Sequence, residues 1–455
     1  MTPFSLILIA ALIELTRAQT KPQCAYTYTD QTGNRYAKGR GTFPRMDVYH
    51  FQPPEQPTKI SYLIGIDTPE QNVYWYGSDA KCLDVHCDAR HVYSFVQPFR
   101  NRQAIQPPIY VGTFDIPGTL FLPPYSVTIP TDASRLSHPA CINDDKFAYV
   151  TASGDVVLSS VHGRILVNRK LNAPNDAKIV VNDDRTVMAV YTDATTNRYS
   201  GELFGDRVEA SEMRIMRADT LEDIAIVHLT HRAVFEGLSP MFADIDGDGR
   251  QDIIATMSDS IKGSTLIVFS DQGDEIARSD PTGNAGLWRH QLAVAPFGLN
   301  GSIELATVYQ PHRNHRPEFF QFRKGAPKST NSTTDQPVDV DDVPNSQQLI
   351  RVASKYGYSS HALGSRNLDM AVAGDFNGDG RAELAIPSKS FRRIVGLQRI
   401  DSTNRSPHGR GLAEIWSIWL GERVVSNLAA LKMLNGQLGL GVALENGTIT
   451  VMMPK

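Results

Sequence analysis

Short apolar runs separated by polar turns recur along most of the chain. In residues 178–192 two β-branched runs flank an Asn-Asp-Asp turn, and in residues 147–158 two runs flank Ser-Gly-Asp. Another pair of runs meets at Asn446-Gly447, a dipeptide that favours a tight hairpin. Few windows show the i, i+3, i+4, i+7 spacing of an amphipathic helix. The pattern predicts an all-β chain.

Two segments of the chain repeat the same order of residues. Residues 242–255 read FADIDGDGRQDIIA, and residues 373–386 read AGDFNGDGRAELAI. A third segment, residues 303–307, repeats only the strand-like end of this pattern. The matching acidic positions of the three segments are Asp252, Glu304 and Glu383. The interval from Glu304 to Glu383 is longer by about half than the interval from Asp252 to Glu304.

The longer interval contains a polar, acidic stretch at residues 324–348, rich in Ser, Thr and Pro, which has the composition of a disordered insert. Without this stretch the two intervals are nearly equal. A period of roughly 50–60 residues built from strands is typical of a β-propeller whose blades are four-stranded antiparallel sheets. We therefore predict about seven blades in residues 60–455, preceded by an N-terminal extension at residues 19–59.

Composition and charge narrow the class of protein. Hydrophobic residues make up 41% and charged residues 21% of the chain, which excludes a disordered chain, a collagen and a coiled coil. The 45 basic and 49 acidic residues give a net charge of -4. A nucleic-acid binder would carry the opposite sign, so we expect no nucleic-acid partner.

The N-terminus predicts export. Residues 5–13, SLILIAALI, form an apolar run of the length of a signal-peptide core, and small residues follow at Thr16 and Ala18. We predict a signal peptide at residues 1–18 and a mature chain beginning at Gln19; the alternative is a buried N-terminal strand or helix. Because no later stretch is long and apolar enough to span a bilayer, we expect no membrane span in the mature chain. The predicted location is extracellular, or periplasmic in a bacterium.

Four cysteines lie in the first third of the chain, and an even number in an exported protein favours disulfides. Three pairings are possible. The short spacing of Cys82 and Cys87 favours pairing them, which leaves Cys24 with Cys141. A metal site at Cys82, His86 and Cys87 is the alternative, although this is not the spacing of a standard zinc knuckle.

The two acidic segments carry the sharpest chemistry in the sequence. In the pattern D-x-D-x-D-G-x-x-D the side chains at positions 1, 3 and 5 converge because the loop curls back at the glycine, and position 7 adds a backbone carbonyl. Position 9 adds a further carboxylate. Such a set of oxygen ligands suits Ca²⁺. The predicted ligands are Asp244, Asp246, Asp248, Asp252 and the carbonyl of Arg250 in the first loop, and Asp375, Asn377, Asp379, Glu383 and the carbonyl of Arg381 in the second.

Two other interpretations of these loops fit the sequence less well. An EF-hand needs a glutamate at position 12, where this chain has Ala255 and Ile386, and it needs a helix where these loops precede strand-like runs. A polar hairpin turn without metal is the simpler alternative, and the occurrence of two matching loops argues against it.

The two loops resemble the calcium loops of the FG-GAP and VCBS repeat families, which form β-propellers such as the head of integrin α chains. The resemblance covers about 18 residues at each loop and is weak elsewhere. It implies that each loop joins two strands of a blade and that Ca²⁺, bound by the eight side chains named above, stiffens the blade edge. Members of these families serve as adhesion modules, as carbohydrate or protein binders and, in a minority, as enzyme scaffolds, so the fold does not select a ligand.

No catalytic motif stands out, since the chain has neither a G-x-S-x-G nor an H-E-x-x-H sequence. The leading hypothesis is a secreted calcium-binding propeller that acts as a binding or adhesion module for an extracellular protein or polysaccharide. The alternative is a calcium-dependent carbohydrate-active enzyme, a lyase or hydrolase, on the same scaffold.

Overall fold

The computed structural model describes most of the chain as β-strands and turns. The described residues are 31–53, 60–67, 72–80, 89–100, 103–104, 108–115, 130–134, 136–137, 139–199, 201–324, 348–401, 405–406, 409–433 and 435–454. Within these ranges no helix is long and apolar enough to cross a membrane. The predicted signal peptide and cleavage site lie outside the described residues.

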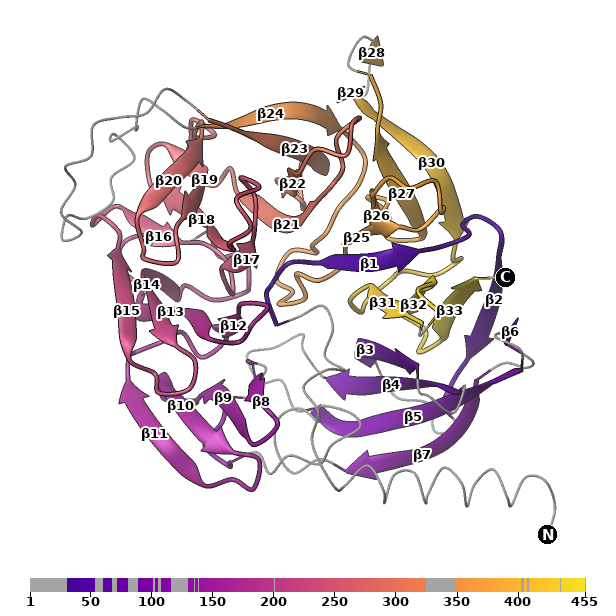
Figure 1. Cartoon of the computed structure of the whole chain (residues 1–455), viewed down its shortest axis with the longest axis horizontal. Coiled ribbons are helices and arrows are strands. Elements are labelled where there is room, and N and C mark those ends of the chain that lie inside the picture. Colours follow the sequence, from indigo (N-terminus) through magenta and orange to yellow (C-terminus); the bar gives the residue numbers. More distant parts are fainter. Residues whose placement is uncertain are drawn as a thin grey trace.

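The strand pairings group the described strands into seven blades of four antiparallel strands around a central axis (Figure 1), and further pairings join blades 3, 4 and 5 into one 15-stranded sheet. This arrangement confirms the predicted all-β, seven-bladed fold. The first strand of each blade lies toward the middle of the ring. In chain order, blade 1 contains β3 (Ile60–Asp67), β4 (Asn72–Ala80), β5 (Ala89–Arg100) and β7 (Ile109–Asp115); blade 2 contains β8 (Ala140–Asn143), β9 (Lys146–Val150), β10 (Asp155–Ser160) and β11 (Ile165–Lys170); blade 3 contains β12 (Val180–Val181), β13 (Val187–Thr195), β14 (Glu209–Arg217) and β15 (Asp223–His228).

The remaining four blades follow the same plan. Blade 4 contains β17 (Met241–Ala243), β18 (Asp252–Asp259), β19 (Gly263–Phe269) and β20 (Glu275–Ser279); blade 5 contains β21 (Arg289–Ala295), β22 (Glu304–Tyr309), β23 (Arg316–Arg323) and β24 (Gln348–Lys355); blade 6 contains β25 (Val372–Asp375), β26 (Glu383–Pro387), β27 (Arg393–Arg399) and β30 (Leu412–Trp419); blade 7 contains β31 (Ala429–Lys432), β32 (Leu438–Ala443), β33 (Ile449–Pro454) and β2 (Met46–Phe51). Short additional strands are β1 (Tyr36–Arg40), β6 (Gln103–Ala104), β16 (Ala233–Phe235), β28 (Arg405–Ser406) and β29 (Gly409–Arg410).

Hydrophobic side chains pack between consecutive blades. In β18, Ile253 and Ala255 belong to the cluster between blades 3 and 4, whereas Ile254 belongs to the cluster between blades 4 and 5. Successive strand residues point to opposite faces of a sheet, and in each blade of this kind both faces are covered by the neighbouring blades. This is why strands such as β18 and β21 are buried along their whole length instead of at alternate positions.

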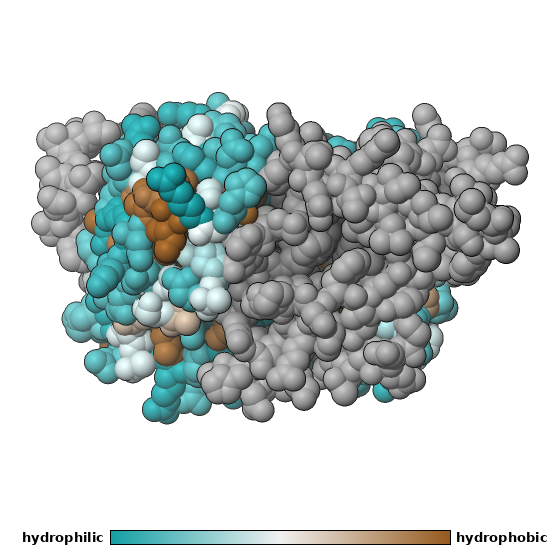
Figure 2. All heavy atoms as spheres, turned by 90° about the horizontal axis from the view of Figure 1, so that it is seen from below, coloured by the Kyte–Doolittle hydropathy of each residue, from teal (hydrophilic) through white to brown (hydrophobic). Residues whose placement is uncertain are grey.

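The outer edge of the ring is mostly polar. Figure 2 shows one side of the molecule, on which the described surface is mainly hydrophilic with a small hydrophobic area. The outer strand β11 exposes Ile165 and Leu166. Two adjacent exposed apolar residues make only a small apolar area, of a size that is common on protein surfaces.

The N-terminal segment closes the ring. β2 pairs antiparallel with β33 in register from Met46–Pro454 to Phe51–Ile449, and so becomes the outer strand of blade 7. We predicted residues 19–59 to lie outside the propeller; instead, part of this segment completes the last blade. The sequence pattern could not show this, because the partner strand lies at the opposite end of the chain.

Residues 31–41, called here the channel segment, run along the inner strands of five successive blades. Backbone N–H groups of Val181 and Phe242, in blades 3 and 4, donate to the carbonyls of Gln31 and Thr32 at 2.6 and 2.7 Å. In blade 6, the N–H of Ala373 donates to the carbonyl of Arg35 at 2.7 Å. The segment therefore satisfies backbone donors that face the axis.

The same segment also reaches blades 5 and 7. The side chain of Asn34 exchanges hydrogen bonds with the backbone of Val294 in β21, at 2.9 and 3.1 Å. The buried guanidinium of Arg35 donates to the carbonyl of Leu428 at 2.6 Å, immediately before β31. Figure 1 shows β1, the last part of the segment, running outward from the middle of the ring beside β25.

Cys141 of β8 is disulfide-bonded. The other three cysteines, Cys24, Cys82 and Cys87, lie outside the described residues. The pairing of Cys24 with Cys141 and of Cys82 with Cys87 stays a prediction, as does the alternative metal site.

Close packing of the channel segment predicts a strong effect of a single methyl group. A Cβ atom added at Gly41 would lie 2.0 Å from the carbonyl oxygen of Phe376. We expect Gly41→Ala to lower the free energy of unfolding by about 1–3 kcal/mol, because backbone atoms must move apart. Lys38→Ala, at an exposed position of the same segment, should change it by less than about 0.5 kcal/mol. Urea denaturation of both variants measures this, and equal stabilities would contradict the packing.

The predicted insert connects two residues that are already paired, since Arg323 of β23 lies opposite Gln348 of β24. Gln348 thus belongs to a strand, and residues 325–347 lie outside the described residues. Replacing residues 325–347 by Asn-Gly should leave the melting temperature unchanged or slightly higher, because a shorter loop loses less entropy on closure. Calorimetry tests this. A clear fall in melting temperature would show that the removed residues pack on the propeller.

Candidate functional site

The two acidic loops occupy equivalent positions in blades 4 and 6. One joins β17 to β18 and the other joins β25 to β26, so each connects the first and second strands of its blade. The position-9 residues, Asp252 and Glu383, begin the second strands, and both side chains are buried. The strands therefore hold the last acidic residue of each loop in place.

Backbone hydrogen bonds shape the first loop. The Asp244 carboxylate accepts hydrogen bonds from the N–H groups of Gly247 and Gly249 at 2.7 and 3.0 Å. Both glycines have positive φ angles, 77° and 89°, which allow the chain to curl around the carboxylate. Asp252 closes the loop by accepting a hydrogen bond from Ile245 N–H at 3.2 Å.

The second loop repeats these contacts. The Asp375 carboxylate accepts a hydrogen bond from Gly380 N–H at 3.0 Å, and Asn377 accepts one from Asp379 N–H at 2.8 Å. Glu383 takes the place of Asp252 and accepts a hydrogen bond from Phe376 N–H at 2.7 Å. The similar sequence therefore produces the same local geometry twice.

Three carboxylates converge in each loop. Their oxygen atoms lie within 4.8 Å of one another in both groups. The distance is short enough for one ion to contact all three. The groups are Asp244, Asp246 and Asp252 in blade 4, and Asp375, Asp379 and Glu383 in blade 6.

Burial and mutual repulsion disfavour the charged form of these acids. Burial, followed by the neighbouring carboxylates, raises the pKa of Asp252 to about 7 and that of Glu383 to about 8. Burial also raises the pKa of Asp375. The nearest cations, Arg40 at 3.6 Å from Asp375 and Lys324 at 3.9 Å from Asp246, have exposed side chains and offset little of this. Each group would gain from a bound cation.

Among the predicted carboxylate ligands, Asp248 alone does not join its group. Its carboxylate lies 3.2 Å from the guanidinium of Arg250 and also accepts a hydrogen bond from the Arg250 N–H. The equivalent Asp379 does belong to the second group. The predicted carbonyl ligands belong to Arg250 and Arg381, which follow the loop glycines at the same position in each repeat.

Gln398 of β27, which is not among the residues predicted from the sequence, supports the second group. Its amide nitrogen donates to Asp379 at 2.8 Å and to Glu383 at 3.4 Å. No local pattern marks this residue, because it reaches the loop from the third strand of the blade. It would hold two of the three carboxylates in position.

A second cluster of polar residues contains histidines from blade 5 and the following connection. His290 lies 3.1 Å from the hydroxyl of Ser360 and stacks on Trp288 with ring centroids 5.2 Å apart. His361 lies 2.7 Å from the carbonyl of Ser365. Burial lowers the pKa of His290 to about 3 and that of His361 to about 4. These histidines are neutral, buried packing residues.

The histidine cluster predicts acid lability. Because the folded pKa values lie below the value of about 6.5 in an unfolded chain, the unfolded state binds more protons as the pH falls below about 6.5. Each histidine should therefore reduce the free energy of unfolding by about 2 kcal/mol between pH 7 and pH 5. In His290→Gln the decrease in the free energy of unfolding between pH 7 and pH 5 should be smaller by about half of the decrease that His290 and His361 cause together. In His162→Gln, a change at an exposed position, the decrease should be the same as in the wild type. Urea denaturation at both pH values measures these differences, and an identical pH dependence in the two variants would contradict them.

Comparisons with known proteins give no family. No protein-family model matches the chain, and no curated protein matches it. Solved structures with a similar course of the chain include BamB from Moraxella catarrhalis, with 8% identity over 90% of this chain and 98% of that chain and a TM-score of 0.39. Another is BBS1N in complex with ARL6DN, with 9% identity over 91% of this chain and 98% of that chain and a TM-score of 0.46. A third is a humanized mutant of the Chaetomium thermophilum Polycomb Repressive Complex 2 bound to the inhibitor GSK126, with 8% identity over 90% of this chain and 97% of that chain and a TM-score of 0.47. Similarities at this level carry no information about function.

Proposed function

We propose that this protein is a secreted, calcium-binding β-propeller that serves as a binding module for an extracellular protein or polysaccharide. The observation that carries the calcium assignment is the repeated loop, in which three carboxylates converge in two different blades. One chance cluster of acids would be unremarkable on a protein surface. Two clusters with the same backbone contacts and one buried acid each support a shared role in binding a cation.

The donor atoms favour Ca²⁺ over other metals. Both groups consist of carboxylates, without histidine or cysteine, and hard oxygen donors suit Ca²⁺ or Mg²⁺. The oxygen Oδ1 of Asp375 is buried and has no hydrogen-bond partner, which fits an atom that would face an ion. In the second loop, three carboxylates supplemented by the predicted Asn377 amide and Arg381 carbonyl would suit Ca²⁺, which accepts six to eight oxygens, better than Mg²⁺, which retains water.

The resemblance to FG-GAP and VCBS repeats is part of the same proposal. In this interpretation the bound ion holds the turn between the first two strands of blades 4 and 6. The chemistry it supplies is electrostatic, because it neutralises carboxylates that the fold brings together. The residues of the chain position those carboxylates through the N–H groups of the loop glycines.

The binding role is favoured over the enzyme alternative by the state of the polar clusters. A lyase or hydrolase needs an acid and a base that can reach a substrate. In the described part of the chain, His290 is buried, and the partly buried Lys178 and Asp369 that act on its charge are paired with each other at 2.9 Å. Groups held in this way are suited to packing more than to proton transfer.

Removal of calcium tests the metal site. With Ca²⁺ at ten times a dissociation constant of ~0.1 mM, each site should add roughly 1.4 kcal/mol to the free energy of unfolding. We expect EDTA to lower the melting temperature of the wild type. Asp252→Asn and Glu383→Gln should each lose about half of the increase in the free energy of unfolding that calcium gives to the wild type. The double variant should lose all of this increase.

Asp274→Asn serves as the control, because Asp274 is an exposed acid in the turn between β19 and β20. It should keep the full calcium increment. A wild-type melting temperature that is the same with Ca²⁺ and with EDTA would refute the calcium assignment.

The binding role is tested separately with immobilised polysaccharides. Retention of the protein without release of reducing or unsaturated ends is the expected result. Calcium-dependent release of such ends would overturn this proposal in favour of the carbohydrate-active enzyme.

A further inference from the structure

Two neighbouring cavities on the outer part of blades 4 to 6 concentrate positive charge. The first, of about 390 Å³, lies between β24 and blade 6, and the second, of about 500 Å³, lies between β24 and blade 4. Ile350 and Arg351 of β24 line both cavities, so the two form one row across this strand. Volumes of this size are typical of small-ligand sites.

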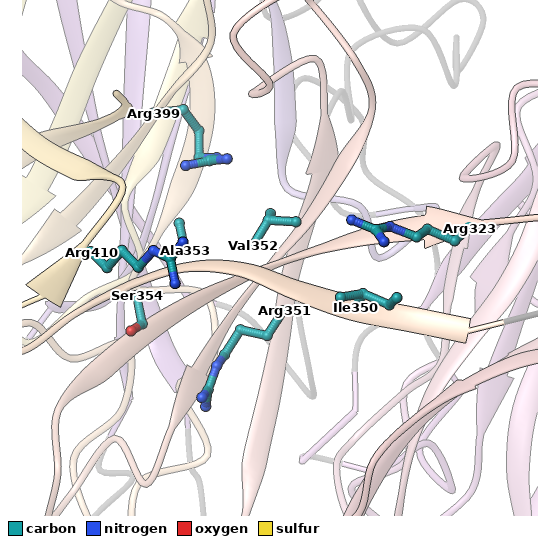
Figure 3. A pocket seen from close by; sticks show the side chains of 8 residues that line it. All are labelled: Arg323, Ile350, Arg351, Val352, Ala353, Ser354, Arg399 and Arg410. Carbon is teal, nitrogen blue, oxygen red and sulfur yellow. The ribbon is translucent and has the colours of Figure 1, made fainter. Parts of the chain in front are cut away.

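Arginines from two blades line the first cavity (Figure 3). Arg399 comes from blade 6, Arg410 from β29, which pairs with β24, and Arg323 from β23, the neighbour of β24 in blade 5. Arg399 is held by Glu304 at 2.9 Å and by the carbonyl of Gly411 at 2.7 Å. The exposed Arg323 and Arg410 form no ion pair among the described residues. Their guanidinium groups are therefore available to a ligand.

Behind the lining of the second cavity, one buried carboxylate, Glu318, pairs with three of the lining arginines. Glu318 lies 3.0 Å from Arg289, 2.7 Å from Arg316 and 2.7 Å from Arg351. A single carboxylate can neutralise only one of the three guanidinium groups, so an excess of positive charge faces the cavity. The remaining charge must be balanced by solvent ions or by an anionic ligand.

The charges of the whole row confirm this excess. Seven arginines line the two cavities, and Asp280 is the only acidic residue among the described lining residues. Adding the three carboxylates that pair with these arginines leaves a net charge of about +3. The chain as a whole has a net charge of -4. The local charge is thus opposite in sign to that of the protein.

Aromatic rings accompany the arginines. The guanidinium of Arg316 lies 4.4 Å from the ring centroid of Tyr309 and 5.4 Å from that of Tyr356. Arg316 also donates to the Tyr356 hydroxyl at 3.0 Å, and Tyr356 is partly exposed. Aromatic faces beside guanidinium groups suit a ligand that combines the apolar face of a ring with an anionic substituent.

We infer that the row of arginine-lined cavities between blades 4 and 6 binds an acidic polysaccharide through its carboxylate or sulfate groups. Two small cavities in line suit a chain that carries anionic groups at intervals. A nucleic acid is disfavoured because its continuous phosphate charge would meet the negative charge of the rest of the protein. The inference rests on the proposed binding role and does not involve the calcium loops.

The test compares retention on three immobilised polymers at 150 mM salt: dextran sulfate, polygalacturonate and neutral dextran. We expect the full-length protein to bind at least one of the two acidic polymers and not neutral dextran. The double variant Arg323→Ala/Arg410→Ala should bind at least tenfold more weakly, because both side chains act on the ligand and neither neutralises a buried carboxylate.

The control double variant is Arg164→Ala/Arg217→Ala, which removes the same charge from exposed positions of blades 2 and 3. It should weaken binding by less than about twofold. Melting temperatures of both variants verify that they are folded. The inference is overturned by binding to neither acidic polymer, by equal losses in the two double variants, or by equal or tighter binding of a single-stranded DNA oligonucleotide that depends on Arg323 and Arg410.

Repeating the measurements in Ca²⁺ and in EDTA separates this inference from the calcium assignment. Retention that persists in EDTA supports the arginine site even if the calcium loops prove inactive. If calcium raises the melting temperature but the protein binds no acidic polymer, the calcium assignment is supported and the inference about the arginine row is overturned.

Discussion

Closure of the ring by β2 against β33 is the interaction on which the rest of the structure depends. In a propeller each blade buries its faces against its two neighbours, so an open ring would expose an apolar face at both ends. Here the open ends would be blades 7 and 1, whose shared cluster includes Ile60, Leu431 and Val451. The paired residues of β2 complete blade 7 and supply part of this packing through Tyr49 and Phe51.

The channel segment connects the strand that closes the ring, β2, to the inner strands around the central axis. It leads directly into β2 after bonding to the inner strands of five blades, so the same stretch of chain joins the centre and the edge. It also touches one of the acidic loops: Gly41 N–H donates to the carbonyl of Asp375, and the carbonyl of Gly41 leaves no room for a side chain at Gly378. The loop of blade 6 is therefore supported by the channel segment as well as by its own backbone.

The acidic groups and the arginine row form at different places on the blades, for different physical reasons. The acidic groups form within a single tight turn, where a few glycines allow neighbouring carboxylates to converge. The arginine row forms between blades, where side chains from separate sheets face the same space. An ion that binds in the turns would stiffen the scaffold, and a ligand that binds between the blades would be recognised by it.

Local sequence determined the strands, the repeat and the two acidic turns of this protein, because each depends on residues close together in the chain. The shared G-D-G-R sequence produces the same turn twice, although it did not show that Asp248 pairs with Arg250 instead of joining its group. Only the tertiary structure decided what lies beside these elements: it placed β2 in the last blade, Gln398 beside the second loop and arginines from three blades around β24. None of these contacts leaves a local pattern. The physical reason is that the local pattern of apolar residues specifies which strand positions are buried, whereas the neighbour that covers them is selected by the geometry of the closed ring.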